Sequence, residues 1–488
     1  MNNSKQRKMI KMNRNRAFKY LAMVCFVLNI SGCTPELTNS KSVDTSTPDQ
    51  YNHLKDTVNS AQMNWKEYFS DSNLVALIDT ALYNNQELNI TLQEIEIVRN
   101  EIMARKGEYL PFVGVRGGAG IDKVGRYTRN GALEATTDIE PGKEFPEPLT
   151  DYMVGAFATW EVDIWRKLRN AKKSAYMDFL SSIEGKNFMV TNLIAEIANS
   201  YYELLALDNQ LDIVNQNIEI QTNALKIVKL QKQSARVTEL AVRRFEAQVF
   251  DTRSLQFEIQ QKIIEAENRI NFLVGRYPKS IPRDSDAFIG LSPNNIQVGI
   301  PAQLLDNRPD IKQAELELEA AKLDVKVAKA NFYPSFDISA GVGFQAFNPS
   351  HLLTTPESLI YSLAGDLTAP LINRYAIKAA YYNANARQIQ AIYNYERSIL
   401  NAYIEVANQL SRIGNLENSY DLKLKQVEAL TASIKISNDL FRSARADYME
   451  VLLTQRDALE SKFELIETKM RQMNAKVNIY QALGGGWN

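Results

Sequence analysis

The chain contains the same large unit twice, and this repeat constrains its fold more than any other feature of its 488 residues. Short segments of the first half return in the second. Two return 223 positions on, Asn84-Asn85-Gln86-Glu87-Leu88 as Asn307-Arg308-Pro309-Asp310-Ile311 and Tyr109-Leu110-Pro111 as Phe332-Tyr333-Pro334. Two later ones return 209 positions on, Glu196-Ile197-Ala198-Asn199 as Glu405-Val406-Ala407-Asn408 and Ser234-Ala235-Arg236 as Ser443-Ala444-Arg445. The difference of 14 residues lies in a loop that is longer in the first copy. A period this long excludes a solenoid, so we predict one module used twice with internal twofold symmetry.

The N-terminus has the features of an exported lipoprotein. Residues 1–32 carry seven basic residues, no acidic residue and an apolar run that is too short to span a bilayer, as in a signal peptide. The run ends in Ile30-Ser31-Gly32-Cys33, which resembles a bacterial lipobox and makes Cys33 the predicted lipidation site. A chance cysteine near an ordinary cleavage site is the alternative. Residues 33–62 are rich in Ser, Thr, Asn, Asp and Pro and predict a lipidated, flexible linker.

Composition excludes several classes of function. Cleavage before Cys33 leaves one cysteine, itself acylated, and changes the formal charge from −1 to −8, which argues against disulfides and nucleic-acid partners. The two histidines, His53 and His351, have no other ligand at metal-binding spacing. Walker loops, nucleophile elbows and dinucleotide fingerprints do not occur in the sequence. We therefore predict no catalytic residue, metal site or cofactor.

Each copy contains two segments with strict apolar–polar alternation. The apolar positions are Val113, Val115, Gly117, Ala119 and Ile121, then Tyr152, Val154, Ala156, Ala158 and Trp160, and in the second copy Phe336, Ile338, Ala340, Val342 and Phe344, then Tyr361, Leu363, Gly365, Leu367 and Ala369. A run of about ten residues is the length of a tilted strand that crosses a bilayer. Soluble β-hairpins are the alternative. If the four strands span a membrane, several chains must pool them, because four cannot close a barrel and an open sheet edge cannot face lipid.

The remaining sequence predicts long helices. Residues 186–274 and 415–483 lack Gly and Pro, and apolar residues recur every seven positions at Val190, Ile197, Leu204, Leu211, Ile218 and Leu225, and at Ile399, Val406, Ile413, Tyr420, Val427, Ile434 and Phe441. We expect helices over residues 73–108 and 166–233, the second being about 100 Å long. Turns should follow at residues 234–238 and 443–447, with Thr238 and Asp447 as N-caps. Such helices predict a tube or rod without a compact core.

Several motifs resemble the outer-membrane efflux protein family, the TolC-like channels. They are Leu304-Leu305-Asp306-Asn307-Arg308-Pro309-Asp310-Ile311, Ala330-Asn331-Phe332-Tyr333-Pro334, Trp160-Glu161-Val162-Asp163-Ile164-Trp165-Arg166, Tyr448-Met449-Glu450-Val451-Leu452 and Ala482-Leu483-Gly484-Gly485-Gly486-Trp487. The resemblance extends over about residues 63–487. Within the family, the chain is most similar to the lipoprotein branch that works with resistance–nodulation–division pumps.

The resemblance implies a homotrimer with a 12-stranded β-barrel in the outer membrane and a long coiled-coil α-helical barrel in the periplasm. It implies passive export, powered by an inner-membrane resistance–nodulation–division pump and reached through a periplasmic adaptor protein. The adaptor-contacting tips would be Ala235, Arg236, Val237 and Thr238, and Ala444, Arg445, Ala446 and Asp447. Asp447 and Glu450 would be the acidic gate at the closed end. Ala235 and Ala444 depart from the usual turn glycine, and Leu453 stands where aspartate is frequent.

The predicted fold class is therefore mainly α with a membrane β-barrel, four strands coming from each chain. A first repeat (63–275), an equatorial connector (276–305) and a second repeat (306–488) follow the signal peptide and linker. The predicted function is the lipid-anchored outer-membrane exit duct of a tripartite efflux pump for small molecules. The channel of a type I protein secretion system is one alternative, and a structural periplasmic coiled-coil lipoprotein is another. Cargo cannot be read from the sequence.

Overall fold

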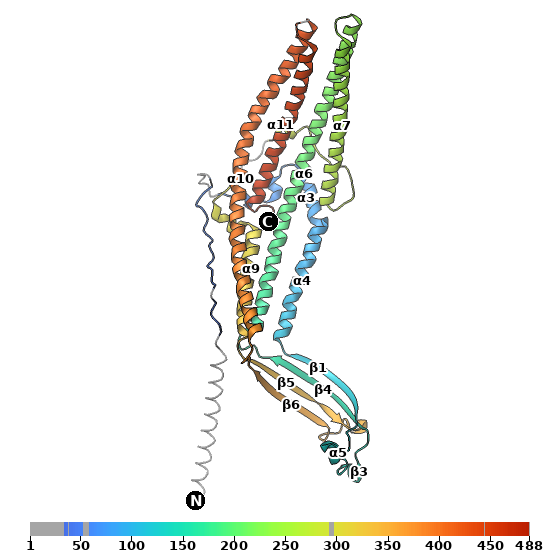
Figure 1. Cartoon of the computed structure of the whole chain (residues 1–488), viewed down its shortest axis with the longest axis vertical. Coiled ribbons are helices and arrows are strands. Elements are labelled where there is room, and N and C mark those ends of the chain that lie inside the picture. Colours follow the sequence, from blue (N-terminus) through green and yellow to red (C-terminus); the bar gives the residue numbers. More distant parts are fainter. Residues whose placement is uncertain (1–33, 38, 52–57, 292–296, 444, 488) are drawn as a thin grey trace. The chain divides into compact units, whose positions relative to one another are not determined.

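The described residues form long helices, a four-stranded antiparallel sheet and a small two-stranded hairpin. The computed structural model describes residues 34–37, 39–51, 58–291, 297–443 and 445–487. The chain forms two compact units: unit 1 contains the described residues up to Ser42, Glu96–Phe179 and Leu316–Ile392, and unit 2 contains Val43–Ile95, Leu180–Glu315 and Tyr393–Asn488 as far as they are described. Four helices, α4 (Gln86–Tyr109), α6 (Lys167–Gln233), α9 (Pro309–Ala330) and α10 (Tyr375–Arg442), contribute residues to both units (Figure 1).

The sheet of unit 1 contains the four predicted strands. They are β1 (Phe112–Asp122), β4 (Leu149–Glu161), β5 (Ser335–Ala346) and β6 (Leu359–Thr368), hydrogen-bonded in the order β1-β4-β5-β6 (Figure 1). Val115 pairs with Ala156, Ala156 with Val342, and Val342 with Tyr361. Because residues that pair directly lie on the same side of a sheet, the four predicted apolar sets share one face. The opposite face carries Arg116, Asp151, Ser339 and Gln345.

The central strands approach each other closely at a glycine pair. Gly155 of β4 pairs with Gly343 of β5, and a Cβ atom on Gly343 would lie 2.4 Å from the carbonyl oxygen of Val154. A side chain there would force the two strands apart. Strands β1 and β6 are the edges of the sheet, so one row of backbone groups on each has no strand partner among the described residues.

The longer loop of the first copy has structure that the sequence did not predict. It contains α5 (Arg129–Glu134) and a small hairpin of β2 (Asp138–Glu140) and β3 (Lys143–Glu144). Thr128 caps α5 by accepting a hydrogen bond from Gly131 N. His351, the last residue of the short helix Pro349–His351 in the other loop, contacts Glu140 at 3.2 Å.

The long helices agree with the predicted ranges, except that the first is interrupted. Residues 73–108 form α3 (Ser72–Asn84) and α4 rather than one helix, because Asn85 adopts an extended conformation. Its side chain accepts a hydrogen bond from Leu88 N and donates one to the carbonyl oxygen of Leu273, at 2.9 and 2.8 Å. The other helices are α7 (Glu239–Leu273), α11 (Tyr448–Ala482) and the short α2 (Trp65–Tyr68) and α8 (Leu304–Asn307). None of the described helices has the length and apolar character needed to cross a membrane.

The interruption at Asn85 has a counterpart in the second copy. Arg308, also extended, separates α8 from α9 and donates a hydrogen bond of 2.8 Å to the carbonyl oxygen of Ala482, the repeat equivalent of Leu273. Beside each contact lies a glycine with positive φ, Gly275 (76°) and Gly484 (88°). Added Cβ atoms would lie 2.4 Å from Asn84 O and 2.6 Å from Asn307 O. Each copy therefore joins its helical hairpin to the preceding helix through the same close backbone contact.

Unit 2 contains a substantial hydrophobic core, so the expectation that these helices lack a compact core is wrong for this unit. Residues of α3, α6, α7 and α11 form one buried cluster, together with Trp65, Phe69 and Phe288. Ile197 and Leu204, two of the predicted heptad positions, are fully buried in it. A completely buried Leu or Ile side chain contributes roughly 1.5–3 kcal/mol, so this cluster is a principal source of stability for unit 2.

Described residues of the segment after residue 33, where the sequence predicts a flexible linker, contact both units. Leu37 packs against the cluster of Ala328, Phe332 and Tyr381 in unit 1. In unit 2, Asp44 N donates to Glu396 Oε1 at 3.1 Å, and the buried Tyr51 stacks on Tyr403 with ring centroids 5.4 Å apart. These contacts fasten the segment to the surface of α9 and α10.

Candidate functional site: the tips of the helical hairpins

The two long hairpins end in the predicted turns. Figure 1 shows α6 and α7 in green and yellow-green, and α10 and α11 in orange and red, each pair ending in a tight connection. The first turn contains Ala235, Arg236, Val237 and Thr238, and the second contains Arg445, Ala446 and Asp447. Ala444, another predicted tip residue, lies outside the described residues.

Both tips line one groove of about 510 Å³. Its walls are Gln231, Arg236, Val237 and Thr238 from the first hairpin, and Phe441, Arg442, Ala446, Asp447 and Tyr448 from the second. Beneath it, Val228, Val242, Phe245 and Val451 are buried in a small hydrophobic cluster that contains residues of both hairpins. The tips are thus packed together, and Arg236, Arg442 and Asp447 place both signs of charge on the groove.

The two hairpins begin their returning helices differently. The hydroxyl of Thr238 accepts a hydrogen bond from Ala241 N, as predicted for an N-cap. Asp447 occupies the predicted N-cap position of α11, but its carboxylate makes no capping hydrogen bond. Asp447 and Glu450 are both exposed, and they lie three positions apart at the start of one helix. Their carboxylates are therefore accessible to solvent and ions.

Ala235 holds the first turn in a strained conformation. Its φ is +56°, in the left-handed region where a Cβ atom costs roughly 1–2 kcal/mol. The turn is stabilised by hydrogen bonds from Ala235 N to Lys232 O and from Arg236 N to Gln231 O, both 2.9 Å long. This turn position therefore has glycine-like geometry, and alanine adopts it here.

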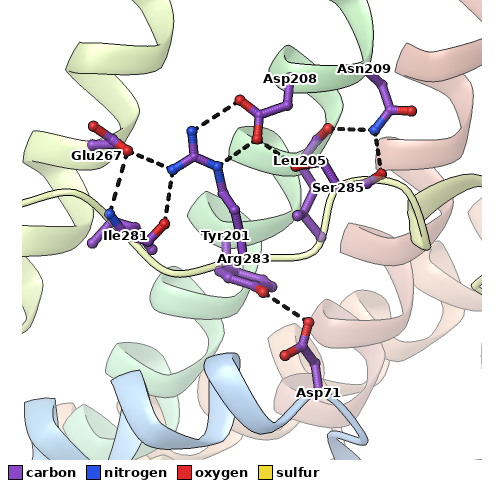
Figure 2. A network of polar contacts seen from close by, with 9 residues as sticks. All are labelled: Asp71, Tyr201, Leu205, Asp208, Asn209, Glu267, Ile281, Arg283 and Ser285. Carbon is purple, nitrogen blue, oxygen red and sulfur yellow. Dashed lines mark hydrogen bonds and ion pairs between the residues drawn. The ribbon is translucent and has the colours of Figure 1, made fainter. Parts of the chain in front are cut away.

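An ion network farther from the tips was not predicted. Arg283, in the segment between α7 and α8, donates from Nε to Asp208 Oδ2 at 2.5 Å and from Nη2 to Asp208 Oδ1 at 3.0 Å. Its Nη1 donates to Glu267 Oε1 at 2.5 Å. Figure 2 shows the guanidinium between these carboxylates of α6 and α7. Arg283 therefore connects both helices of the first hairpin.

Further contacts hold the same segment in place. Ser285 donates from its hydroxyl to Asp208 Oδ2 at 2.5 Å, and Asn209 Nδ2 donates to the carbonyl oxygens of Ser285 and Leu205 (Figure 2). Burial alone would lower the pKa of Arg283, but the hydrogen bonds and charges of Asp208 and Glu267 raise it above its ordinary value. The guanidinium stays charged. Arg283 and Asp208 are 75 residues apart, and no periodic pattern marks them as partners.

Comparisons with known proteins identify the family. The family model "Outer membrane efflux protein" matches residues 77–276 and 300–485, which is most of the chain. The chain belongs to the outer membrane efflux protein family. It is 26% identical over 469 residues to the pyoverdine export outer membrane protein OpmQ of Pseudomonas aeruginosa, covering 96% of both chains. It is 24% identical over 475 residues to the probable outer membrane lipoprotein SilC of Salmonella typhimurium, covering 96% of this chain and 98% of SilC.

The fold agrees with this membership. A crystal structure of a membrane protein from Pseudomonas aeruginosa superposes with a TM-score of 0.83 at 22% identity, covering 93% of this chain and 100% of the other. The efflux protein is located in the outer membrane, and the members of its family are channel proteins. No cluster of three or more His, Cys, Asp or Glu side chains within the described residues is arranged to hold a metal ion. Cys33 lies outside these residues.

Ala235→Gly should stabilise the first tip. Glycine removes the strain of the left-handed conformation, partly offset by the greater freedom of glycine in the unfolded chain, for a net gain of up to about 1 kcal/mol. We expect amide hydrogen exchange of residues 236–242 to slow by up to about fivefold, since local opening becomes less favourable by that amount. Ala224→Gly, inside α6, is the control and should speed exchange nearby. Faster exchange in Ala235→Gly would contradict the strain argument.

Arg283→Met should destabilise unit 2 strongly. Removing one partner from a largely buried ion network costs about 3–5 kcal/mol, because Asp208 and Glu267 are left without their shared cation. Urea unfolding followed by tryptophan fluorescence measures the loss. Arg269→Met is the matched control, since it breaks one exposed pair with Glu203 and should cost at most about 1 kcal/mol. Equal effects of the two substitutions would show that the network adds nothing beyond a surface pair.

Proposed function

We propose that this efflux protein is the exit duct of a tripartite efflux pump and that it works as a homotrimer. The observation that carries the proposal is the four-stranded sheet with one apolar face, open edges and direct connections to long helices. In lipid, the unpaired backbone groups of β1 and β6 would each cost several kcal/mol. Pairing β6 of one copy with β1 of the next satisfies them, and three copies close a barrel of 12 strands.

The polar face of the sheet suits a water-filled lumen. In register, Glu161 pairs with Asp337 and Asp337 with Asp366, so a row of three carboxylates lies where the strands meet the helices. Three copies would form an acidic ring, which favours cations over anions in the pore. A wide polar tube needs no specific pocket, which supports passive transport. OpmQ is named for pyoverdine export, and we propose small molecules as the cargo class here without assigning one.

The tips are the proposed contact with the rest of the pump. The sequence contains no nucleotide-binding motif, so energy must come from elsewhere, and we assign it to an inner-membrane resistance–nodulation–division pump joined through a periplasmic adaptor. The groove between the hairpin tips has apolar residues and both signs of charge, which suits docking of a helical partner. Asp447 and Glu450 are the proposed acidic gate, and the uncapped state of Asp447 supports this assignment.

We also propose that the mature chain is anchored through acylated Cys33. The fixed contacts of Leu37, Asp44 and Tyr51 fit an anchor that leads directly into the folded protein. The proposed organisation keeps the signal peptide at 1–32, the repeats at 63–275 and 306–488, and the connector at 276–305. Within that connector, the Arg283 network supports a role in bracing the first hairpin.

Ile338→Arg tests the barrel. Ile338 lies on the apolar face of β5, so arginine there should oppose insertion by roughly 2–4 kcal/mol if the face contacts lipid near the middle of the bilayer. The neighbouring Ser339→Arg, on the polar face, should be tolerated. The measurement is the amount of heat-modifiable oligomer in outer-membrane fractions. Equal insertion of the two variants would refute a lipid-facing role for the apolar face.

The gate assignment is tested by single-channel recording of Asp447→Ala with Glu450→Ala. Removing carboxylates that line a narrow passage in three copies should raise conductance and weaken the preference for cations. Asp439→Ala, in the last turns of α10, is the control and should change neither. If the double variant conducts like the wild type with the same ion preference, Asp447 and Glu450 do not form the gate, and the channel proposal is unaffected.

A further inference from the structure

Helix α7 presents an unexplained apolar stripe to solvent. Phe250, Phe257 and Ile264 follow one another at intervals of seven residues and are 51–68% exposed in the single chain. Seven-residue spacing places them on one side of the helix, the pattern of a surface that packs against another helix. The other sides of α7, which contain Val249, Ile259 and Ile263, are buried in the same chain. The stripe is therefore a second packing face with no partner among the described residues.

The internal repeat identifies what such a face contacts. A shift of 209 residues maps α7 (Glu239–Leu273) onto α11 (Tyr448–Ala482). The stripe then corresponds to Leu459, Ile466 and Met473, which are only 2–9% exposed. Ile466 and Met473 belong to the core cluster that also contains α6 residues. Hydrogen bonds from Asn199 to Asn478 at 2.9 Å and from Gln481 to Asn192 at 2.7 Å join α6 and α11 directly.

The equivalent of this α6–α11 contact would join α10 and α7. The same shift maps Thr191 and Ala195 of α6, which are 3–4% exposed, onto Leu400 and Ile404 of α10, which are 44–58% exposed. The surfaces of α7 and α10 that would form the equivalent contact are thus both exposed in the single chain. A second copy can supply the missing partner, so that α7 of one copy packs on α10 of the next. Because each copy then uses two different surfaces, the contact is head-to-tail, the kind of contact from which a closed ring such as a trimer is built.

Charged residues make this junction specific. Within the chain, Glu203, Arg269 and Asn474 line one polar cleft of about 410 Å³ beside α6 and α11. There, Arg269 neutralises Glu203 at 2.9 Å. The repeat equivalents of Glu203 and Asn474 are Arg412 on α10 and Glu265 on α7. Both are exposed, and neither has an ion-pair partner within the described part of the chain, although Gln261 donates a hydrogen bond to Glu265.

We propose that Arg412 of one copy forms an ion pair with Glu265 of the next copy in the channel. This inference rests on the proposed homotrimer and adds the surface and the charges that assemble it. The charges at the junction between copies are complementary to each other, whereas the equivalent pair within the chain is Glu203 and Asn474. An arginine facing the wrong junction would meet an asparagine instead of a carboxylate. The pair therefore favours the head-to-tail register of copies over other pairings of these similar helices.

Charge reversal tests the pair. Arg412→Glu and Glu265→Arg should each lower the association constant of the detergent-solubilised trimer at least about tenfold, because like charges then face each other. The doubly reversed variant should recover most of that loss. Analytical ultracentrifugation of the full-length protein measures both. Single reversals without effect, or a double variant no better than the single ones, would overturn the proposal.

Cross-linking gives a readout that does not depend on stability. Arg412→Cys combined with Glu265→Cys, treated with a short bismaleimide, should give covalent dimers and trimers on a denaturing gel. The control combines Arg412→Cys with Gln256→Cys, since Gln256 lies on the face of α7 that is hydrogen-bonded to Asn215 of α6, and it should remain monomeric. A wild-type protein that is monomeric would refute the homotrimer itself. A trimer that the first pair fails to link would refute only the assigned junction.

Discussion

In each copy, the residue that interrupts a helix donates a side-chain hydrogen bond to the last residue of a later helix, 188 positions on in the first copy and 174 in the second. Asn85 does so to Leu273, and Arg308 does so to Ala482. The glycines beside these contacts let two backbones approach to a distance that no side chain would permit. Each contact holds the end of a hairpin that lies away from its tip. Because the returning helices are 35 residues long, the position of each tip depends on this contact.

The chemistry of the two joints differs although their geometry is shared. Asn85 is neutral, whereas Arg308 is buried and held by Asp310 at 2.7 Å and by Glu405 at 2.7 Å. Burial alone would lower the pKa of Arg308, yet Asp310 and Glu405 raise it, so the joint stays charged. The buried guanidinium beside the first hairpin instead belongs to Arg283 of the connector, and it lies between Asp208 of α6 and Glu267 of α7. The two copies thus share a backbone contact at the joint, but only the second has a charged side chain there.

Periodic features could be predicted from the sequence, and contacts between distant residues could not. Alternation located all four strands and their apolar face, because the side chains of a strand alternate whatever its neighbours are. Heptads and the absence of Gly and Pro located α6, α7, α10 and α11. The break at Asn85 and the Arg283 network depend on partners 188 and 75 residues away, for which a single sequence has no local signal.

At the tips, the turns were predicted correctly. The missing capping hydrogen bond of Asp447 could not be predicted, because it depends on the rotamer of the aspartate side chain. The stacking of Tyr51 on Tyr403 likewise has no signal in the polar composition of the N-terminal segment.

The order of strands in the sheet has a consequence for how the protein is made. The central pair, β4 with β5, joins residues 194 positions apart, as the contact between Asp151 and Gln345 shows. During export the β1–β4 hairpin is complete long before β5 arrives, and it must wait with an apolar face and an unpaired edge. Contacts of such high sequence separation form slowly and expose the chain to aggregation while they do. Biogenesis of this protein should therefore be limited by the lifetime of that half-formed sheet, and it should depend on periplasmic factors that shield one hairpin until the second is delivered.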